Sequence, residues 1–162
     1  EFIFGSQRMA AGFVLNNELT DFASIPTLGG KAVANAVEPG KRPRSSMTPT
    51  LIFDGDGELV MATGSPGGNS IIAYTAKTLV AMLDWGLSPQ EAAALPNVVA
   101  RGDVVNIEEG FDASIMETLR SRGFEIEGGR GENSGIHIVR VGEDGELAGA
   151  ADPRRDGTVG RP

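Results

Sequence analysis

Thr63-Gly64-Ser65-Pro66-Gly67-Gly68 lies between a run typical of a β-strand and a run typical of an α-helix. Glycines at such a corner favour a sharp change of chain direction, because they adopt backbone angles that other residues avoid. The first N–H groups of the helix that follows have no acceptor within it and carry the positive end of its dipole. We therefore predict a strand-to-helix corner that either holds a phosphate or an oxyanion, or is a tight turn without a ligand. No lysine follows the glycines, so the pattern does not indicate a P-loop.

The elements on either side of this corner are predicted from short-range patterns. Asp54-Gly55-Asp56-Gly57 separates two β-rich runs, 48–53 and 58–63, which predicts a hairpin. After the corner, apolar residues recur at three- and four-residue steps and predict a helix that ends at Gly86. Its predicted buried face consists of Ile72, Ala76, Leu79, Val80 and Leu83. Ser88-Pro89-Gln90-Glu91 is typical of the start of a second, short helix.

The rest of the chain alternates between strands, helices and loops. We predict a strand at 12–15, a long loop at 24–46, a strand at 103–107, a helix at 112–122, a strand at 124–127 and a hairpin formed by 136–141 and 146–148. The tail, 152–162, has little hydrophobic content and is expected to run over the surface. This order of elements indicates an α+β layered fold, with residues 1–162 forming a single domain.

Composition narrows the classes of function. The 162 residues carry a formal net charge of −8, so a phosphate backbone would be repelled and nucleic-acid binding is not expected. No apolar run reaches the length of a membrane span. The chain has no cysteine and only one histidine, His137, which argues against a thiolate or multi-histidine metal site and against a Ser–His–Asp triad. No metal or cofactor is expected.

Two further polar clusters stand in predicted loops. Ser45 and Ser46 can offer hydroxyl and backbone donors to a carboxylate, or mark the polar entry of a strand. Glu18 and Asp21 can bind an ammonium group together, or are solvated surface charges. His137 stands between two isoleucines on a predicted strand, which places it on the opposite face as a half-exposed residue.

Four motifs, taken in this order, resemble the γ-glutamyltranspeptidase family. They are Leu15-Asn16-Asn17-Glu18-Leu19-Thr20-Asp21-Phe22, Arg42-Pro43-Arg44-Ser45-Ser46-Met47-Thr48-Pro49, Thr63-Gly64-Ser65-Pro66-Gly67-Gly68 and Gly149-Ala150-Ala151-Asp152-Pro153-Arg154. The likeness is to the small subunit that this family makes by self-cleavage of a precursor, and it covers essentially the whole chain. It implies part of the four-layer αββα sandwich of the N-terminal-nucleophile hydrolases, which a large subunit completes.

The resemblance also implies a reaction. In the family, a threonine exposed at the start of the small subunit attacks a γ-glutamyl amide such as glutathione, with its own α-amine as base. The acyl group then passes to water, an amino acid or a peptide. Gly67 and Gly68 resemble the pair whose backbone N–H groups form the oxyanion hole. The family's small subunit begins upstream of the Phe-Gly-Ser segment near Glu1, so the resemblance implies that the nucleophile is absent from this chain, which alone is expected to be inactive.

Substrate-binding roles follow from the same resemblance. Ser45 and Ser46 resemble the serines that hold the substrate's α-carboxylate. Glu18 and Asp21 match the positions that bind its α-ammonium, with Glu18 standing where many members have glutamine. Glu1 matches a further ammonium ligand at the end of the alignment.

Three interpretations of function stay open at this point. The first is a γ-glutamyl transferase or hydrolase that pairs with the large subunit of its precursor and is periplasmic or secreted, as the family suggests. The second is an acylase of the same superfamily for glutaryl or cephalosporin-type amides, and the third is a non-catalytic fragment. Glu18 and Asp21 favour the first over the second, because an unpaired carboxylate pair disfavours a plain glutaryl chain.

Overall fold

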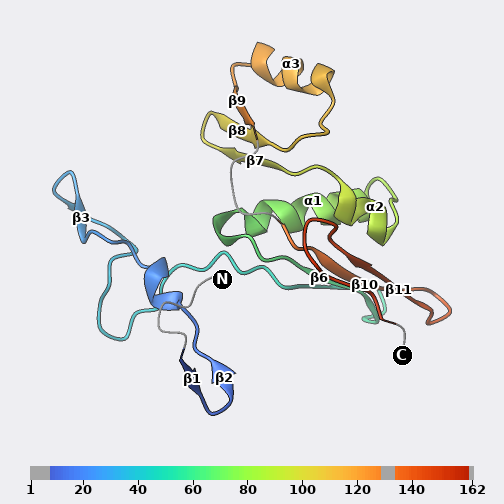
Figure 1. Cartoon of the computed structure of the whole chain (residues 1–162), viewed down its shortest axis with the longest axis horizontal. Helices are drawn as coiled ribbons and strands as arrows, with labels where there is room; N and C mark the ends of the chain where they lie inside the picture. Colours follow the sequence, from blue (N-terminus) through green and yellow to red (C-terminus); the bar gives the residue numbers. More distant parts are fainter. Residues whose placement is uncertain (1–7, 129–133, 161–162) are drawn as a thin grey trace. The chain divides into compact units, whose positions relative to one another are not determined.

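The computed structural model describes residues 8–128 and 134–160, which are coloured along the chain in Figure 1. They belong to two compact units, Glu1–Ser46 and Met47–Pro162. The single domain expected over residues 1–162 stays a prediction.

The first unit holds short elements joined by loops. These are β1 (Met9–Ala10), β2 (Phe13–Val14), the 3-10 helix η1 (Glu18–Asp21), β3 (Thr27–Leu28) and β4 (Lys31–Ala32). Strands β1 and β2 form one antiparallel pair, and β3 and β4 form another. The second pair lies inside the segment predicted as a continuous loop, so that prediction was wrong there. Gly29 and Gly30 both have positive φ, at 56° and 76°, and such a pair makes a two-residue hairpin turn.

A four-stranded antiparallel sheet forms the centre of the second unit. Its strands are β5 (Thr50–Phe53), β6 (Leu59–Gly64), β10 (His137–Val141) and β11 (Leu147–Ala151), in the order β11-β10-β6-β5. Both hairpins predicted from the sequence are confirmed, with 54–57 as the turn of the first. The pairing of His137 with Gly64 brings the start of β10 beside the end of β6.

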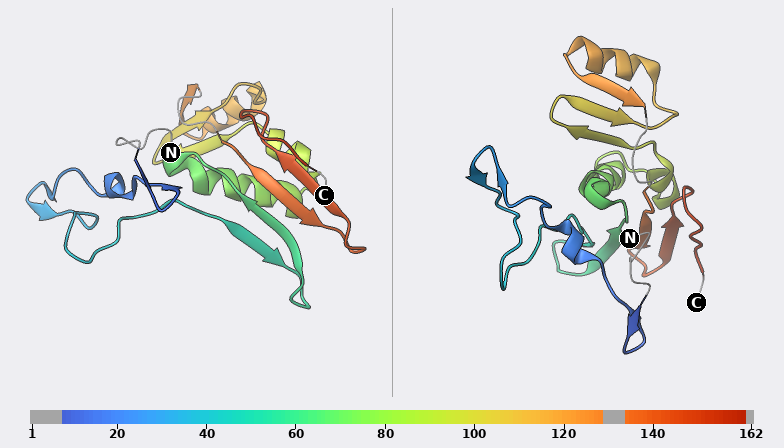
Figure 2. Two further views of the ribbon diagram at one scale, coloured as in Figure 1. Left: turned by 60° about the horizontal axis from the view of Figure 1, so that its bottom comes forward. Right: turned by 60° about the vertical axis from the view of Figure 1, so that its left-hand side comes forward.

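Two helices, α1 (Ile71–Leu83) and α2 (Pro89–Ala94), cover one face of this sheet, as both views of Figure 2 show. The core between them and the strands consists of Met61, Tyr74, Ala81, Ala92, Ala93, Ile136, Ile138 and Ala150. The predicted start of α2 is confirmed: Ser88 and Glu91 form a reciprocal capping box, and Pro89 is the first helical residue.

The predicted face of α1 was wrong. The helix turns Tyr74, Thr75, Thr78 and Ala81 inward, together with Ile71, while Ile72, Val80 and Leu83 are exposed. Threonine tolerates this position because its hydroxyl can bond a carbonyl one turn back, as Thr78 Oγ1 donates to Tyr74 O at 2.9 Å. Small inward side chains also let the helix axis approach the sheet closely.

The other face of the sheet is rich in exposed apolar side chains. Leu51, Phe53, Val139 and Leu147 are 48–59% exposed. A soluble domain rarely leaves so many apolar residues uncovered on one surface. The described part of the second unit thus supplies a helix layer and a sheet layer, and its mixed composition confirms the α+β class.

A smaller three-stranded sheet follows α2. It contains β7 (Val98–Arg101), β8 (Val104–Ile107) and β9 (Glu125–Gly128), with α3 (Ala113–Ser121) connecting the parallel pair β8 and β9. Strand β7 was missed from the sequence, whereas the other three elements match their predictions within two residues. Asp112 caps α3 by accepting a hydrogen bond from Ser114 N. Within residues 8–128 and 134–160, no helix is long and apolar enough to cross a membrane.

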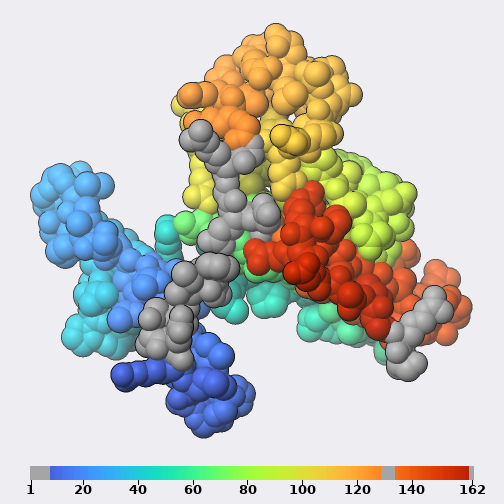
Figure 3. Space-filling view, in the orientation of Figure 1, coloured from blue at the N-terminus to red at the C-terminus, as the bar shows by residue number. Residues whose placement is uncertain are grey.

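The start of the C-terminal tail contradicts its predicted surface position. Asp152 is 1% exposed, although the residues after it are mostly exposed. In Figure 3 the C-terminal residues (red) lie against those of α2 (yellow-green). Four donors around the carboxylate compensate its burial. Two of them belong to Arg154 in the tail itself, and the other two, Ser134 Oγ and Ile136 N, lie just before β10.

Candidate functional site

Glu18 and Asp21 lie on one turn, the 3-10 helix η1. Side chains three residues apart eclipse each other on such a helix, so the two carboxylates share a side. Both residues are half-buried. Asn16 fixes the start of the turn by accepting a hydrogen bond from Glu18 N at 3.1 Å. The arrangement presents two negative groups together, which suits a cationic ligand.

Asn35 joins this turn to the segment that carries the serines. Its side-chain Nδ2 donates to Asp21 O at 2.6 Å, and its Oδ1 accepts from Arg44 N at 2.9 Å. Ser45, which is exposed, and Ser46, which is half-buried, follow Arg44 directly. Two motifs far apart in the sequence are therefore brought together within the first unit. Asn35 was not predicted from the sequence. The only indication was that an asparagine stands between the two motifs that carry the resemblance.

Ser45 and Ser46 do not begin a strand, because β5 starts only at Thr50. The segment between them and that strand has no regular secondary structure. Glu1, the third residue assigned to ammonium binding by resemblance, lies outside the described residues.

The corner after β6 has the backbone geometry that its glycines predict. Gly67 has φ 135° and Gly68 has φ 51°, and the first of these is essentially closed to residues with a Cβ. Gly68 begins a short 3-10 helix, Gly68–Ser70, which continues into α1. Gly67 and Gly68 are its N-cap and first residue, so their N–H groups have no acceptor within the helix. This corner can donate two backbone hydrogen bonds to an oxyanion.

Ser65 fixes the peptide that precedes Gly67. Its hydroxyl donates to Pro66 O at 2.7 Å and accepts from Gly135 N at 3.0 Å. In a trans peptide the N–H points away from the C=O, so holding the Pro66 carbonyl also sets the direction of the Gly67 N–H. A Cβ built on Gly135 would lie 2.8 Å from Pro66 Cγ, which shows how tightly the start of β10 packs on the corner.

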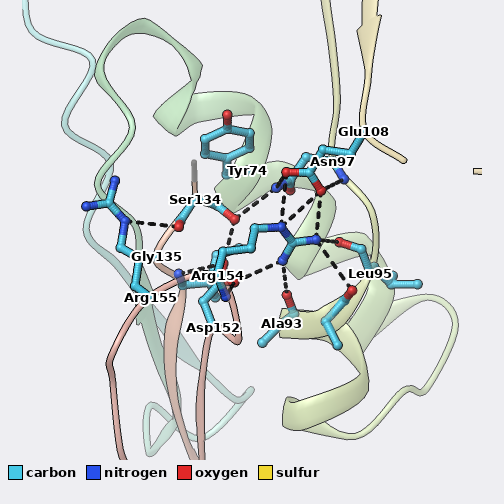
Figure 4. A network of polar contacts seen from close by, with 12 residues as sticks. Tyr74, Ala93, Leu95, Asn97, Glu108, Ser134, Gly135, Asp152, Arg154 and Arg155 are labelled. Atoms are coloured by element: carbon cyan, nitrogen blue, oxygen red, sulfur yellow. Dashed lines mark hydrogen bonds and ion pairs between the residues drawn. The ribbon is translucent and has the colours of Figure 1, made fainter. Parts of the chain in front are cut away.

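A buried polar network lies next to that strand start, where Figure 4 shows its members converging on Asp152 and Arg154. The side chain of Asp152 is fully buried. Its Oδ2 accepts from Ser134 Oγ and from Ile136 N, and its Oδ1 accepts from Arg154 N and Arg154 Nη1 at 2.9 Å each. The carboxylate is therefore fully supplied with donors.

Arg154 extends the network to two more segments. Its guanidinium pairs with Glu108, with Nη2 at 2.7 Å from Oε2, and also donates to Ala93 O and Leu95 O at the end of α2. Asn97 donates to both Glu108 and Ser134. The tail, α2, the end of β8 and the start of β10 are thus held by one set of charge-assisted bonds.

The charges of this network shift one another's titration. Burial alone would raise the pKa of Asp152, but the hydrogen bonds from Ser134 and Arg154 outweigh it and hold that pKa below its usual value. The pKa of Glu108 is lowered in the same way, against its own burial, by Arg154 and Asn97. Burial, followed by the charge of Arg154, lowers the pKa of Lys77 to about 8; its Nζ donates to Leu95 O at 2.8 Å.

His137 lies on the exposed side of β10, opposite Ile136 and Ile138, as predicted. One ring nitrogen, Nδ1, is 3.0 Å from Gly135 O. A Cβ on Gly157 would lie 2.7 Å from the other nitrogen, Nε2, so the tail passes close to the ring. Among the described residues, no three His, Cys, Asp or Glu side chains are grouped so as to hold a metal ion.

The candidate residues therefore fall into two groups. Glu18, Asp21, Ser45 and Ser46 lie in the first unit and are linked through Asn35, whereas the corner at 67–68 belongs to the second unit.

Comparison with known proteins adds independent information. A family model described as gamma-glutamyltranspeptidase matches residues 1–161. The chain is 38% identical over 153 residues to the glutathione hydrolase proenzyme of Escherichia coli (strain K12), covering 89% of this chain and 26% of that protein. It is 32% identical over 158 residues to the acylase ACY 1 proenzyme of Pseudomonas sp. (strain V22), covering 96% and 27%.

A solved structure of this family is also similar to the chain. The γ-glutamyltranspeptidase of Pseudomonas nitroreducens complexed with L-DON superposes with a TM-score of 0.81 at 29% identity, covering 98% of this chain and 88% of that one. The chain spans only 26% and 27% of the length of the two curated relatives named above.

Proposed function

Because this chain belongs to the γ-glutamyltranspeptidase family, we propose that it forms most of the small subunit of an enzyme that cleaves γ-glutamyl amides such as glutathione. The γ-glutamyl group would pass through an acyl-enzyme to water, an amino acid or a peptide. The observation that carries this proposal is the family match over residues 1–161, which includes every motif that the sequence offers for this chemistry. The fold supports it, because solved members of the family share this α+β arrangement, an N-terminal-nucleophile hydrolase sandwich.

The corner at Gly67 and Gly68 is proposed to be the oxyanion hole. Attack on the amide carbonyl places a negative charge on its oxygen, and two fixed N–H donors stabilise that charge more than they stabilise the neutral carbonyl. Ser65 holds the Pro66 carbonyl, so the Gly67 donor is oriented before substrate binds. The nucleophile is proposed to be a threonine in a segment outside these 162 residues, with its own α-amine as base.

The first unit is proposed to bind the amino-acid end of the substrate. Glu18 and Asp21, on one side of η1, would bind the α-ammonium with charge-assisted hydrogen bonds. Ser45 and Ser46 would donate to the α-carboxylate, and Glu1 would be a further ammonium ligand. No metal or cofactor is part of this proposal.

The large subunit of the same precursor is the proposed partner. The exposed apolar side chains of Leu51, Phe53, Val139 and Leu147 support a second layer over the open sheet face, because covering them removes apolar area from water. A periplasmic or secreted location is proposed from the family alone.

The acylase alternative is not favoured. The chain resembles an acylase proenzyme as well as glutathione hydrolases, since all belong to one superfamily. However, a glutaryl group carries no ammonium, and the half-buried pair Glu18 and Asp21 would then face a ligand without a positive charge.

The test is to express the full-length precursor and the 162-residue chain in parallel. We expect the precursor to cleave itself into two subunits and to release aniline from a γ-glutamyl anilide, while the isolated chain releases none. Turnover by the pure isolated chain would contradict the placement of the nucleophile. A processed precursor that cleaves glutaryl anilide but no γ-glutamyl anilide would contradict the substrate assignment.

A further inference from the structure

We propose that Asn35 is a positioning residue that sets the spacing between the ammonium-binding turn, Glu18–Asp21, and the carboxylate-binding serines, Ser45 and Ser46. The inference rests on the substrate roles given under the proposed function. It adds a residue that neither the motifs nor the comparisons assign.

The side chain and the backbone carbonyl of Asn35 connect separate parts of the first unit. Its side chain donates to Asp21 O at 2.6 Å, 14 residues earlier in the chain. It accepts from Arg44 N at 2.9 Å, nine residues later. Its backbone carbonyl accepts from Ala23 N at 2.9 Å. The residue is half-buried, so these bonds are partly shielded from competing water.

Both bonds of the side chain end on backbone atoms beside the proposed ligand groups. Asp21 O belongs to the residue that would bind the ammonium, and Arg44 N precedes the two serines. No regular element covers residues 33–46, so side-chain bonds of this kind replace the ladder that would otherwise fix the segment. The Asn35 amide therefore determines how far the turn lies from the serines.

This spacing matters for a ligand that is held at two points. The α-ammonium and α-carboxylate of an amino acid are attached to one carbon, so their separation is fixed. A site whose two halves are fixed at the matching distance binds such a ligand without first ordering its own loops, which otherwise costs affinity. A ligand held at only one of the two points gains little from the same rigidity.

An asparagine is required because the position needs one donor and one acceptor. Asn35→Ala removes both bonds. Asn35→Asp keeps the acceptor for Arg44 N but sets a carboxylate oxygen against Asp21 O, where no donor remains. Asn106→Ala is a matched control, because Asn106 is also half-buried but lies in β8 of the other unit.

The experiment uses the full-length, processed protein and measures binding of L-glutamate and of glutarate by calorimetry. Glutarate has the carboxylates of glutamate but lacks the ammonium. For Asn35→Ala we expect the Kd of L-glutamate to rise about tenfold, as the loss of two ordinary hydrogen bonds allows. Glutarate binding should change by much less. Asn35→Asp should also raise the Kd of L-glutamate with the same preference, because it loses the bond to Asp21 O, and Asn106→Ala should show no effect.

Kinetics supply a second readout. With γ-glutamyl anilide, Asn35→Ala should raise KM while changing kcat by less, because the oxyanion donors are not altered. Equal losses for L-glutamate and glutarate, or an unchanged Kd for both, would overturn the role of Asn35. If Asn35→Ala does not self-process, Asn35→Asp decides by the same comparison.

These measurements distinguish a failure of the inference about Asn35 from a failure of the proposed function. Wild-type protein that binds L-glutamate in an Asn35-dependent way but cleaves no γ-glutamyl anilide would overturn the proposed function and leave the inference standing. Wild-type protein that cleaves the anilide, with L-glutamate affinity indifferent to Asn35, would overturn the inference alone. Wild-type protein that neither binds L-glutamate nor cleaves the anilide would overturn both.

Discussion

Replacing Asp152 by asparagine tests the buried network with the smallest change of shape. The substitution removes the negative charge and turns one of two acceptor oxygens into an NH₂ donor. Oδ2 accepts from Ser134 Oγ and Ile136 N, and Oδ1 accepts twice from Arg154. Whichever way the new amide is placed, two donors lose their acceptor. With the NH₂ in place of Oδ1, both Arg154 donors face another donor; with the NH₂ in place of Oδ2, the Ile136 N–H does, whereas the Ser134 hydroxyl can turn and accept from it.

The expected cost follows from this count. Each buried donor left without a partner costs about 1–3 kcal/mol, so Asp152→Asn should lower the free energy of unfolding by about 2–6 kcal/mol. In this variant the guanidinium of Arg154 still pairs with Glu108. Because Arg154 is not left wholly unpaired, we expect a loss of stability in the middle of that range. Breaking a buried ion pair by removing one partner typically costs about 3–5 kcal/mol, in agreement.

The assay is urea and thermal unfolding of the full-length, processed protein. Asp156→Asn is the matched control, because Asp156 stands in the same tail and is exposed. Such a surface change normally stays within about 0.5 kcal/mol. A loss under about 1 kcal/mol for Asp152→Asn, or one equal to that of the control, would refute the view that this carboxylate is a structural centre.

Three further predictions concern the site and its pH dependence. Gly68→Ala keeps the N–H but adds a Cβ at a residue with φ 51°, which should block or re-aim this donor and lower kcat by about 10²–10³-fold, as the loss of one oxyanion donor does. An unchanged kcat in a folded, processed variant would remove Gly68 from the site. Asp21→Asn should lower kcat/KM for γ-glutamyl anilide, because it weakens a charged hydrogen bond that contributes about 1.5–3 kcal/mol to transition-state binding. Glutaryl anilide, which has no ammonium, should be affected far less. Equal losses for both substrates would show that the role of Asp21 is structural. Because the pKa values of Asp152 and Glu108 lie below their unfolded values, their stabilisation is complete above the unfolded pKa of about 4 and is lost as the pH falls through the folded values. The unfolding temperature should therefore drop below about pH 4, and a flat profile there would contradict the network.

The local elements could be predicted because their signals are local. The DGDG turn, the capping box at Ser88 and the glycine that ends α1 each act within a few residues, and the structure has all three. The face of α1 could not be read in the same way. The helix is apolar on two sides, and only the sheet decides that Thr75 and Thr78 face inward.

Long-range polar contacts account for the other differences between the structure and the sequence-based predictions. Asp152 looked like a surface residue because an isolated buried charge is costly. Its partner Arg154 is only two residues away, but Ser134, and the Glu108 that pairs with Arg154, come from separate segments. The tail alone therefore contained only part of the compensation. Asn35 was not predicted for a related reason. Its role depends on two distant backbone atoms, Asp21 O before it in the chain and Arg44 N after it.

The central claim is that γ-glutamyl transfer proceeds through an acyl-enzyme on the subunit that contains this chain. The direct measurement is the intact mass of both subunits after the processed protein is mixed with a γ-glutamyl donor and quenched in acid. We predict a gain of one γ-glutamyl group on the small subunit, increased in the absence of an acceptor amino acid. A γ-glutamyl group found only on the large subunit, or turnover with no adduct on either subunit at any time, would contradict the claim.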